Sequence, residues 1–204
     1  MSDQDQSFRL DGQVGVITGA AGGIGSALAL GLAQGGADIV VADLASQAAQ
    51  AEETAQAVRD LGRRALVVAL DVTKVASIEA AAAAAVAEWG KIDFWVNCAG
   101  INIRKPVLEY AEGEWDKMSA VNLKGVFFCT QVAARQMAAQ GGGSVVNMAS
   151  QLAVVALHDR SIYAITKAAV AHMAKTFALE LGPQHIRVNA VGPTFVSTPM
   201  TTSM

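Results

Sequence analysis

The chain has 204 residues, of which 52% are hydrophobic and 16% are charged, and its formal net charge is −3. The apolar fraction excludes a disordered chain, and the length suits one compact α/β domain better than two independent catalytic domains. Because the sequence has no basic cluster, it offers no electrostatic surface for nucleic acid or for an anionic membrane. These observations favour a small molecule as the partner.

Short aliphatic or β-branched runs alternate with longer stretches of helical period along almost the whole chain. This alternation predicts a Rossmann-like, doubly wound parallel sheet with helices on both faces, in a single domain over residues 1–204. The expected strands are Val14–Thr18, Asp38–Ala42, Ala65–Leu70, Asp93–Asn97, Ser144–Met148 and Arg187–Val191. The expected helices are Gly23–Gln34, Ser46–Leu61, Val75–Trp89, Glu112–Ala139 and Ser161–Leu181.

A glycine-rich segment joins the first predicted strand to the first predicted helix. Its glycines allow a tight turn and a close approach of the backbone to a pyrophosphate, which the N–H groups of the helix N-terminus would bind. A plain strand-to-helix connection is the alternative, since glycines serve both purposes. The strand before the segment and the helix after it favour dinucleotide binding, and the residues expected to take part are Gly19, Gly23, Ile24 and Gly25.

Asp43 ends the second predicted strand, eighteen residues after Gly25. This interval is close to the roughly twenty residues at which an acidic side chain meets the adenosine ribose in dinucleotide-binding folds. The charge of Asp43 would repel a 2′-phosphate, and neither Leu44 nor the glycine-rich segment contributes a cation, so we expect NAD rather than NADP. The alternative is an exposed Asp that caps the next helix.

Polar residues also follow the later predicted strands. Asn97 and Gly100 lie at the end of the fourth strand, and Ser150 follows the fifth. Ligands bind at the carboxyl ends of strands in an open parallel sheet, so the Ser150 hydroxyl is a candidate to hold a substrate oxygen. Asn122 lies within an apolar helical stretch, where its amide is poorly placed unless it finds buried partners.

Tyr163 and Lys167 are four residues apart in the last long predicted helix and therefore lie on the same helix face. A tyrosine has a pKa of about 10, and a nearby cation favours the phenolate. We therefore expect Lys167 to lower the pKa of Tyr163 and the two residues to act as one catalytic unit. The alternative for the pair alone is a solvated helix face with a partly buried ring.

Cys98 and Cys129 lie in apolar stretches without metal-ligand spacing, so we interpret them as reduced packing residues and expect no metal site. The polar segment Met1 to Asp11 has no apolar signal core. Glycine or a charged residue interrupts each later apolar run before it could cross a bilayer. We therefore expect a cytoplasmic protein without a membrane partner.

These motifs occur together and in a fixed order over nearly the whole chain. The set, which resembles that of a short-chain dehydrogenase/reductase, comprises Thr18, Gly19, Gly23, Gly25, the stretch Asn97 to Gly100, Asn122, Ser150, Tyr163 and Lys167. The resemblance implies hydride transfer between NAD(H) and a secondary alcohol or ketone. It assigns general acid/base catalysis to Tyr163 and the nicotinamide ribose to Lys167, which would also lower the tyrosine pKa. Ser150 would orient the substrate oxygen, and Asn122 would fix a water in a proton relay.

The resemblance also implies further cofactor contacts. Asp71 and Val72 would flank the adenine. The residues that would line the cofactor or contact its nicotinamide end are Asn97, Ala99, Gly100, Pro193 and Thr198, besides Tyr163 and Lys167.

The sequence departs from the family pattern at three places. Cys98 stands where the family usually has a second Asn, and Gly192-Pro193-Thr194 stands where it usually has Pro-Gly. We expect both changes to be tolerated, with an altered shape near the nicotinamide. Family members usually continue beyond the position of Met204 with a substrate-covering segment and a final strand, so we expect that segment to be absent or truncated.

The segments that follow the fourth and fifth predicted strands are the candidate substrate contacts. Arg104, Gln151 and His158 could bind hydroxyls or a carboxylate, with solvated loops as the alternative for each. Their polar character is similar to that of sugar, polyol and aldonate dehydrogenases of the family. A 3-oxoacyl-thioester reductase and a non-catalytic NAD-binding or truncated protein are the alternative functions.

The two longest predicted helices, Glu112–Ala139 and Ser161–Leu181, carry more apolar positions than one sheet face requires. The family usually pairs these helices across a two-fold axis. We therefore expect a homodimer or homotetramer.

Overall fold

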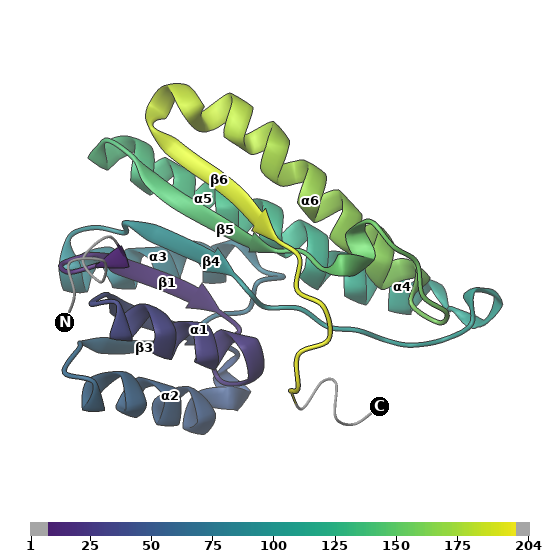
Figure 1. Cartoon of the computed structure of the whole chain (residues 1–204), viewed down its shortest axis with the longest axis horizontal. Helices are drawn as coiled ribbons and strands as arrows, with labels where there is room; N and C mark the ends of the chain where they lie inside the picture. The colour runs from purple at the N-terminus through teal and green to yellow at the C-terminus, as the bar shows by residue number, and fades with distance from the viewer. Residues whose placement is uncertain (1–7, 199–204) are drawn as a thin grey trace.

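The computed structural model describes residues 8–198 (Figure 1). A six-stranded parallel sheet with the strand order β3-β2-β1-β4-β5-β6 lies at its centre. The strands are β1 (Val14–Thr18), β2 (Asp38–Asp43), β3 (Ala65–Ala69), β4 (Phe94–Asn97), β5 (Gly143–Met148) and β6 (Ile186–Val191). Strands β1 to β3 extend the sheet in one direction and β4 to β6 extend it in the other, starting beside β1. This is the strand order of a doubly wound dinucleotide-binding sheet. The structure confirms the predicted fold class, and each predicted strand is correct to within one residue at its ends.

Helices connect the strands. They are α1 (Gly23–Gln34), α2 (Ala48–Asp60), α3 (Val75–Trp89), α4 (Glu112–Ser119), α5 (Val126–Gln140) and α6 (Ser161–Leu181). The predicted bounds of α1, α3 and α6 are confirmed. In the part of the chain that the structure describes, none of these helices is both long enough and apolar enough to cross a membrane.

Two helix predictions require correction. The predicted helix Ser46–Leu61 begins as a short 3₁₀ turn, Ala45–Gln47, before α2. The predicted helix Glu112–Ala139 is not continuous, because a π-helical segment, Ala120–Gly125, separates α4 from α5. Apolar spacing continues through this segment, so periodicity does not reveal the wider turn. Such turns are frequently found at functional sites.

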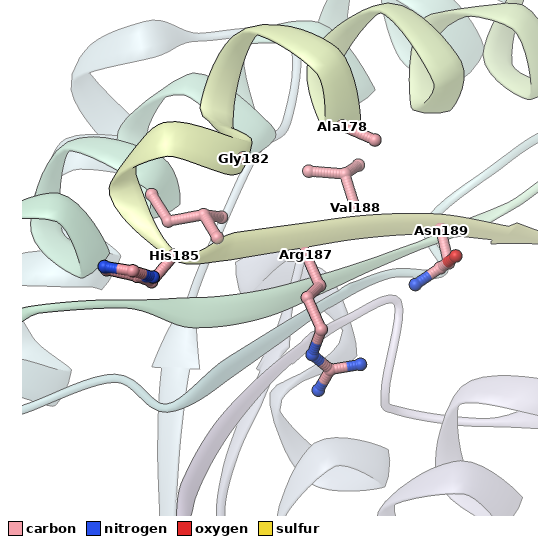
Figure 2. A pocket seen from close by; sticks show the side chains of 7 residues that line it. Ala178, Gly182, His185, Arg187, Val188 and Asn189 are labelled. Carbon is pink, nitrogen blue, oxygen red and sulfur yellow. The ribbon is translucent and has the colours of Figure 1, made fainter.

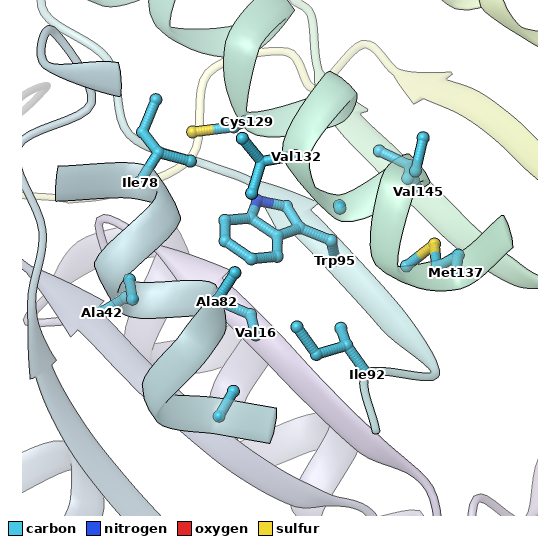
Figure 3. Packing of buried hydrophobic residues seen from close by; sticks show 14 of the residues in the cluster. Val16, Ala42, Ile78, Ala82, Ile92, Trp95, Cys129, Val132, Met137 and Val145 are labelled. Carbon is cyan, nitrogen blue, oxygen red and sulfur yellow. The ribbon is translucent and has the colours of Figure 1, made fainter. Parts of the chain in front are cut away.

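The sheet is covered on both faces. On one face, Trp95 of β4 is fully buried among Ile78 of α3 and Cys129 and Val132 of α5 (Figure 3). On the other face, small residues of α1 and α2 pack against β1 and β2; the buried ones are Ala29, Ala33, Ala51 and Ala55. The alanine-rich part of α3 packs in the same way, since Ala81, Ala82 and Ala85 are buried. Small side chains let these helices approach the sheet closely, and this burial stabilises the fold.

β6 lies at the edge of the sheet. Val188 faces α6 beside Ala178, whereas Arg187 and Asn189 project from the opposite face (Figure 2). The groove that these residues line follows the first part of β6 and the end of α6. It is therefore remote from the carboxyl ends of the strands, where the predicted site residues lie.

Candidate active site

Thr18 joins the carboxyl ends of β1 and β4. Its Oγ1 accepts hydrogen bonds from the N–H groups of Cys98, at 3.0 Å, and Ala99, at 3.1 Å. The next residue, Gly19, has φ of +69°, and a Cβ there would lie 2.8 Å from the Cα of Ala99. The glycine turn is therefore held directly against the segment that follows β4, which is the segment predicted to line a cofactor.

The rest of the glycine turn leads into α1. A Cβ at Gly25 would lie 2.0 Å from the carbonyl oxygen of Gly19, so only glycine fits there. The N-cap of α1 is Gly22, which has no side chain to cap the helix, and the first turn starts with Gly23 and the half-buried Ile24. Glycines here let an anion approach the N–H groups of a helix N-terminus, which fits the pyrophosphate of a dinucleotide.

The Asp43 carboxylate lies at the carboxyl end of β2 and bonds to the glycine turn. Oδ2 accepts from the N–H of Ala21 and Oδ1 from the N–H of Leu44, both at 2.8 Å. The next short helix has Leu44 as its N-cap and no side-chain cap, so the alternative that Asp43 caps this helix is wrong. Within residues 8–198, no described ion pair involves Asp43. A negative charge without a partner cation thus lies beside the turn.

Asp71 and Val72 follow β3. Oδ1 of Asp71 accepts from the hydroxyl of Thr73 at 2.6 Å, and Oδ2 lies 3.1 Å from the ammonium of Lys74. The Thr73 bonds and Lys74 outweigh the opposing effect of burial and lower the pKa of Asp71. Val72 packs beside Gly125 of the π-helical segment. The carboxylate of Asp71 is already bonded within the turn that leads into α3. A contact with adenine therefore stays a prediction for the main chain of Asp71 and for Val72.

Asn97 is buried in a hydrogen-bond network inside the protein. Oδ1 accepts from Trp95 Nε1 at 2.9 Å, and Nδ2 donates to Thr130 Oγ1 at 3.0 Å and to Asn147 Oδ1 at 2.8 Å. These partners occupy both ends of the amide. A contact between Asn97 and a cofactor therefore has to come from its main chain.

Asn122 lies in the π-helical segment with no exposed surface. Oδ1 accepts from the N–H of Ile101 at 2.9 Å, and Nδ2 donates to the carbonyl of Ile101 at 2.8 Å and to Thr166 Oγ1 at 3.3 Å. The partners expected for the buried Asn122 amide are thus Ile101, in the loop after β4, and Thr166, in α6. This amide ties the two segments together.

Tyr163 lies in the first turn of α6, beside Ser150 at the end of β5. Burial raises the pKa of Tyr163, while a hydrogen bond with the Ser150 hydroxyl and the charge of Arg160 act in the opposite direction. The ammonium of Lys167 lies 5.6 Å from the ring centroid of Tyr163. The expected lowering of the tyrosine pKa is therefore wrong for this structure, because burial has the largest effect.

Lys167 is 4% exposed, and its Nζ donates to the main-chain carbonyl of Met148 at 2.6 Å. Burial lowers the pKa of Lys167 to about 8. Gly100 lies beside the side chains of Asn122 and Lys167. A Cβ at this position would be 3.4 Å from Asn122 Oδ1 and 3.7 Å from Lys167 Nζ. The ammonium is thus held among polar groups at the end of β5, in a site that penalises its charge.

The cysteines agree with their interpretation as packing residues. Burial raises the pKa of Cys98 to about 11 and that of Cys129 to about 12, so both thiols are neutral near pH 7. In the part of the chain that the structure describes, no three His, Cys, Asp or Glu side chains gather in a way that could hold a metal ion.

The segment after β6 returns across the carboxyl edge of the sheet toward α1 (Figure 1). The carbonyl of Pro193 accepts from the N–H of Gln151 at 3.0 Å. The methyl group of Thr198 would lie 3.7 Å from a Cβ at Gly23. The structure therefore brings both predicted nicotinamide-end residues to the site, one beside the Ser150 loop and the other beside the glycine turn.

The predicted substrate contacts differ in their exposure. Arg104 and His158 are exposed, and Gln151 is half-buried. Sequence reasoning missed Arg160, which is 8% exposed and contributes a positive charge near Tyr163. Its Nη1 donates to the carbonyl of His158 at 3.1 Å. A basic residue three positions before Tyr163 was the only available signal, and its burial is a tertiary property.

Comparison with known proteins agrees with this geometry. Residues 13–204 match the family model of the short chain dehydrogenases. The chain is 43% identical over 196 residues to the D-threitol dehydrogenase of Mycolicibacterium smegmatis, covering 96% of this chain and 75% of that protein. It is 39% identical over 194 residues to the 3-oxoacyl-(acyl-carrier-protein) reductase of Thermotoga maritima, covering 95% of this chain and 78% of that protein.

A solved structure is similar over the same length. The gluconate 5-dehydrogenase of Burkholderia cenocepacia, crystallised with NADP and tartrate, superposes with a TM-score of 0.92 at 36% identity, covering 98% of this chain and 78% of that one. The chain belongs to the short-chain dehydrogenase family. It is accordingly an oxidoreductase that acts on CH–OH groups.

We predict that Lys167→Met stabilises the protein at pH 7. The pKa of Lys167 is about 8 in the folded protein and 10.5 as its reference value. Charging this buried group therefore opposes folding of the wild type by on the order of 3 kcal/mol below pH 8. The variant avoids this cost but loses the hydrogen bond to the Met148 carbonyl, which offsets part of its gain in stability. We expect the unfolding free energy to rise by about 1–3 kcal/mol.

The sign follows from proton binding. Between pH 8 and 10.5 the unfolded chain binds more protons at Lys167 than the folded one, so wild-type stability rises with pH there. The advantage of Lys167→Met should therefore shrink from pH 7 to pH 10 in urea denaturation. Lys175→Met, at an exposed position of the same helix, serves as the control. An advantage that is independent of pH would contradict the assigned cause.

Proposed function

We propose that this protein transfers a hydride between NAD(H) and a secondary alcohol or ketone of a sugar, polyol or aldonate. The observation that carries the proposal is the convergence of Ser150, Tyr163, Lys167 and Asn122 at the carboxyl edge of the sheet, where the glycine-rich N-terminus of α1 also lies. A nicotinamide bound there supplies the hydride chemistry. The protein contributes orientation and proton transfer. We also propose that residues 1–204 form one domain and that the protein is cytoplasmic.

Each site residue has a role in the proposal. Tyr163 gives a proton to the substrate oxygen in reduction and takes one in oxidation, and its raised pKa favours the protonated form near neutrality. Ser150, whose hydroxyl lies near Tyr163, orients that oxygen. Lys167 holds the nicotinamide ribose. Because the Asn122 amide is occupied by Ile101 and Thr166, we propose that it holds the turn at which a relay water binds.

Two observations support a polyhydroxy substrate. The similar proteins include one named for threitol and one named for gluconate. The loops next to the site carry polar side chains, among them Gln151 and His158. A 3-oxoacyl thioester is the second candidate, because the similar Thermotoga maritima protein is named for it. An NAD-binding protein without turnover is the third, and the Tyr163 experiment below separates it from the other two.

The preference for NAD rests on Asp43. Its carboxylate lies against the glycine turn and has no ion-pair partner among the described residues. A 2′-phosphate beside it would meet like charge, whereas ribose hydroxyls would donate to it. The similar gluconate 5-dehydrogenase was crystallised with NADP, whereas a similar glycerol dehydrogenase of Listeria innocua is named as NAD-dependent, so we propose that Asp43 sets the preference in this protein.

We also propose a homodimer or homotetramer formed through α4, α5 and α6. An apolar hollow lies between these helices, lined by Ala120, Leu123, Phe127, Phe128 and Met173, with Asp116, Ser119 and Lys124 at its border. Phe127 is 38% exposed and packs edge-on against Phe128 and Phe177. A second copy would cover this surface with the same helices, as a two-fold interface requires.

Tyr163→Phe should abolish turnover and leave cofactor binding intact. The phenol is the group that moves the proton, so we expect a loss of about 10²–10⁴-fold in kcat. The assay follows NADH absorbance with sugar alcohols, aldonates and a 3-oxoacyl thioester, and fluorescence titration measures NADH binding. Wild type that binds NADH without turning over any of these substrates would favour a non-catalytic protein. Equal turnover by the variant would remove Tyr163 from the mechanism.

Asp43→Asn should shift the cofactor preference from NADH toward NADPH. Removing the charge while retaining the side-chain shape relieves repulsion of the 2′-phosphate, and we expect the ratio of the two dissociation constants to change by about tenfold. Fluorescence titration with both cofactors measures this ratio. Glu53→Gln, which removes an exposed charge from α2, is the control. A wild-type preference for NADPH would contradict the assignment.

Phe127→Glu should dissociate the oligomer. A charge in the apolar hollow would be buried without a partner in the assembled state, which costs several kcal/mol. Light scattering after size exclusion should give two or four chain masses for wild type and one for the variant. Leu108→Glu, at a residue that is 95% exposed outside this surface, should leave the mass unchanged. A monomeric wild type would contradict the proposed interface.

A further inference from the structure

The hydroxyl of Tyr110 lies between the two loops that border the candidate site. It donates to the carbonyl of Ile103 at 2.8 Å and lies 3.3 Å from the N–H of Lys105, both in the loop after β4. It also lies 3.3 Å from the carbonyl of Asp159, in the loop before α6. The N–H of Lys105 in turn donates to that carbonyl at 3.1 Å. One phenol and one main-chain amide thus connect two segments that are far apart in sequence.

Both loops are anchored at site residues. The first begins at Ile101, whose N–H and carbonyl bond to Asn122. The second begins after Ser150 and ends at Arg160, three residues before Tyr163. A displacement of either loop would therefore move the border of the site without breaking the glycine turn.

Several apolar side chains of these loops remain exposed, although Leu152, close to Ser150, is buried. Leu108 is 95% exposed, Val154 is 88% exposed and Leu157 is 41% exposed. Asp159 has φ of +61°, in the left-handed region that residues other than Gly, Asn and Asp rarely adopt. This conformation directs the Asp159 carbonyl to Lys105 and Tyr110. Hydrogen bonds to main-chain groups are the described contacts that join Asp159 to Lys105 and Tyr110.

We propose that Tyr110 is a positioning residue for the substrate, which acts by joining the loop of Ile103 and Lys105 to the loop of Asp159. The proposal rests on the proposed function for its kinetic consequence. Tyr110 touches neither Tyr163 nor the glycine turn in any described hydrogen bond, so it sets the separation of the two loops that face the substrate. Substrate affinity depends on this contact, and cofactor affinity does not.

Tyr110→Phe tests the proposal because it removes the hydroxyl and keeps the ring. Losing a hydrogen bond of ordinary strength should raise KM for the alcohol about 3- to 10-fold. We expect kcat and the dissociation constant of NADH to remain within about twofold of wild type. A parallel loss of kcat, NADH binding and thermal stability would indicate a general structural role and overturn the proposal. Lys105→Met is the control, because it removes the ion pair with Glu114 and keeps the main-chain N–H.

A second pair of variants tests the Asp159 carbonyl separately. Asp159→Gly retains access to positive φ, whereas the β-branched Asp159→Val does not. Both lose the carboxylate. We expect Asp159→Val to reproduce the KM increase of Tyr110→Phe and Asp159→Gly to behave like wild type. Equal effects of the two variants would mean that the carboxylate, rather than the backbone conformation, is what matters.

Amide hydrogen exchange provides a readout that does not depend on turnover. In Tyr110→Phe, exchange should become faster in peptides that cover 101–106 and 154–160 and stay unchanged in those that cover the glycine turn. Unchanged exchange in the two loops would overturn the proposal even if the enzyme is active. If wild type turns over no alcohol, the proposed function fails, while faster loop exchange would still establish the contact.

Discussion

At the centre of the sheet, β1 and β4 lie side by side, but the chain leaves them in opposite directions, toward β2 on one side and β5 on the other. In open parallel sheets the connections diverge at such a point, and ligands bind outside the carboxyl ends of the strands there. Because all strands are parallel, the glycine turn, the segment after β4, Ser150 and the segment after β6 emerge at this same edge. Thr18 Oγ1 holds the ends of β1 and β4 together by accepting hydrogen bonds from the N–H groups of Cys98 and Ala99. Every functional group discussed above depends on this arrangement.

Burial shifts the pKa values of two groups brought to this edge toward their neutral forms. Burial raises the pKa of Tyr163 and lowers that of Lys167 to about 8, so the environment works against the phenolate and against the ammonium. The Ser150 hydroxyl beside Tyr163 acts against the rise of the tyrosine pKa, and the bond from Lys167 to the Met148 carbonyl favours the ammonium. Of the two groups, Lys167 therefore titrates closer to neutrality, whereas Tyr163 stays protonated there.

Some site residues could be identified from sequence because their signal is local. Tyr163 and Lys167 are one helical turn apart, and Asp43 directly ends an aliphatic strand, so spacing alone places them on one helix face or at a strand end. Other features depend on contacts between distant segments. The bonds of Asn122 to Ile101 and Thr166 accompany a π turn that apolar periodicity does not show, and the network of Trp95, Thr130 and Asn147 directs the Asn97 amide into the core.

The sequence by itself determined the strand and helix order, the parallel sheet, the glycine turn and the residues that resemble the family's catalytic set. These follow from residue periodicity and from local backbone requirements, which act over a few positions. The tertiary structure alone decided the direction of the Tyr163 pKa, the burial of Arg160 and the joining of two loops by Tyr110. Solvation, charge and main-chain hydrogen bonding at these positions are set by segments up to 49 residues away in the chain, and no local pattern encodes which distant segment will arrive.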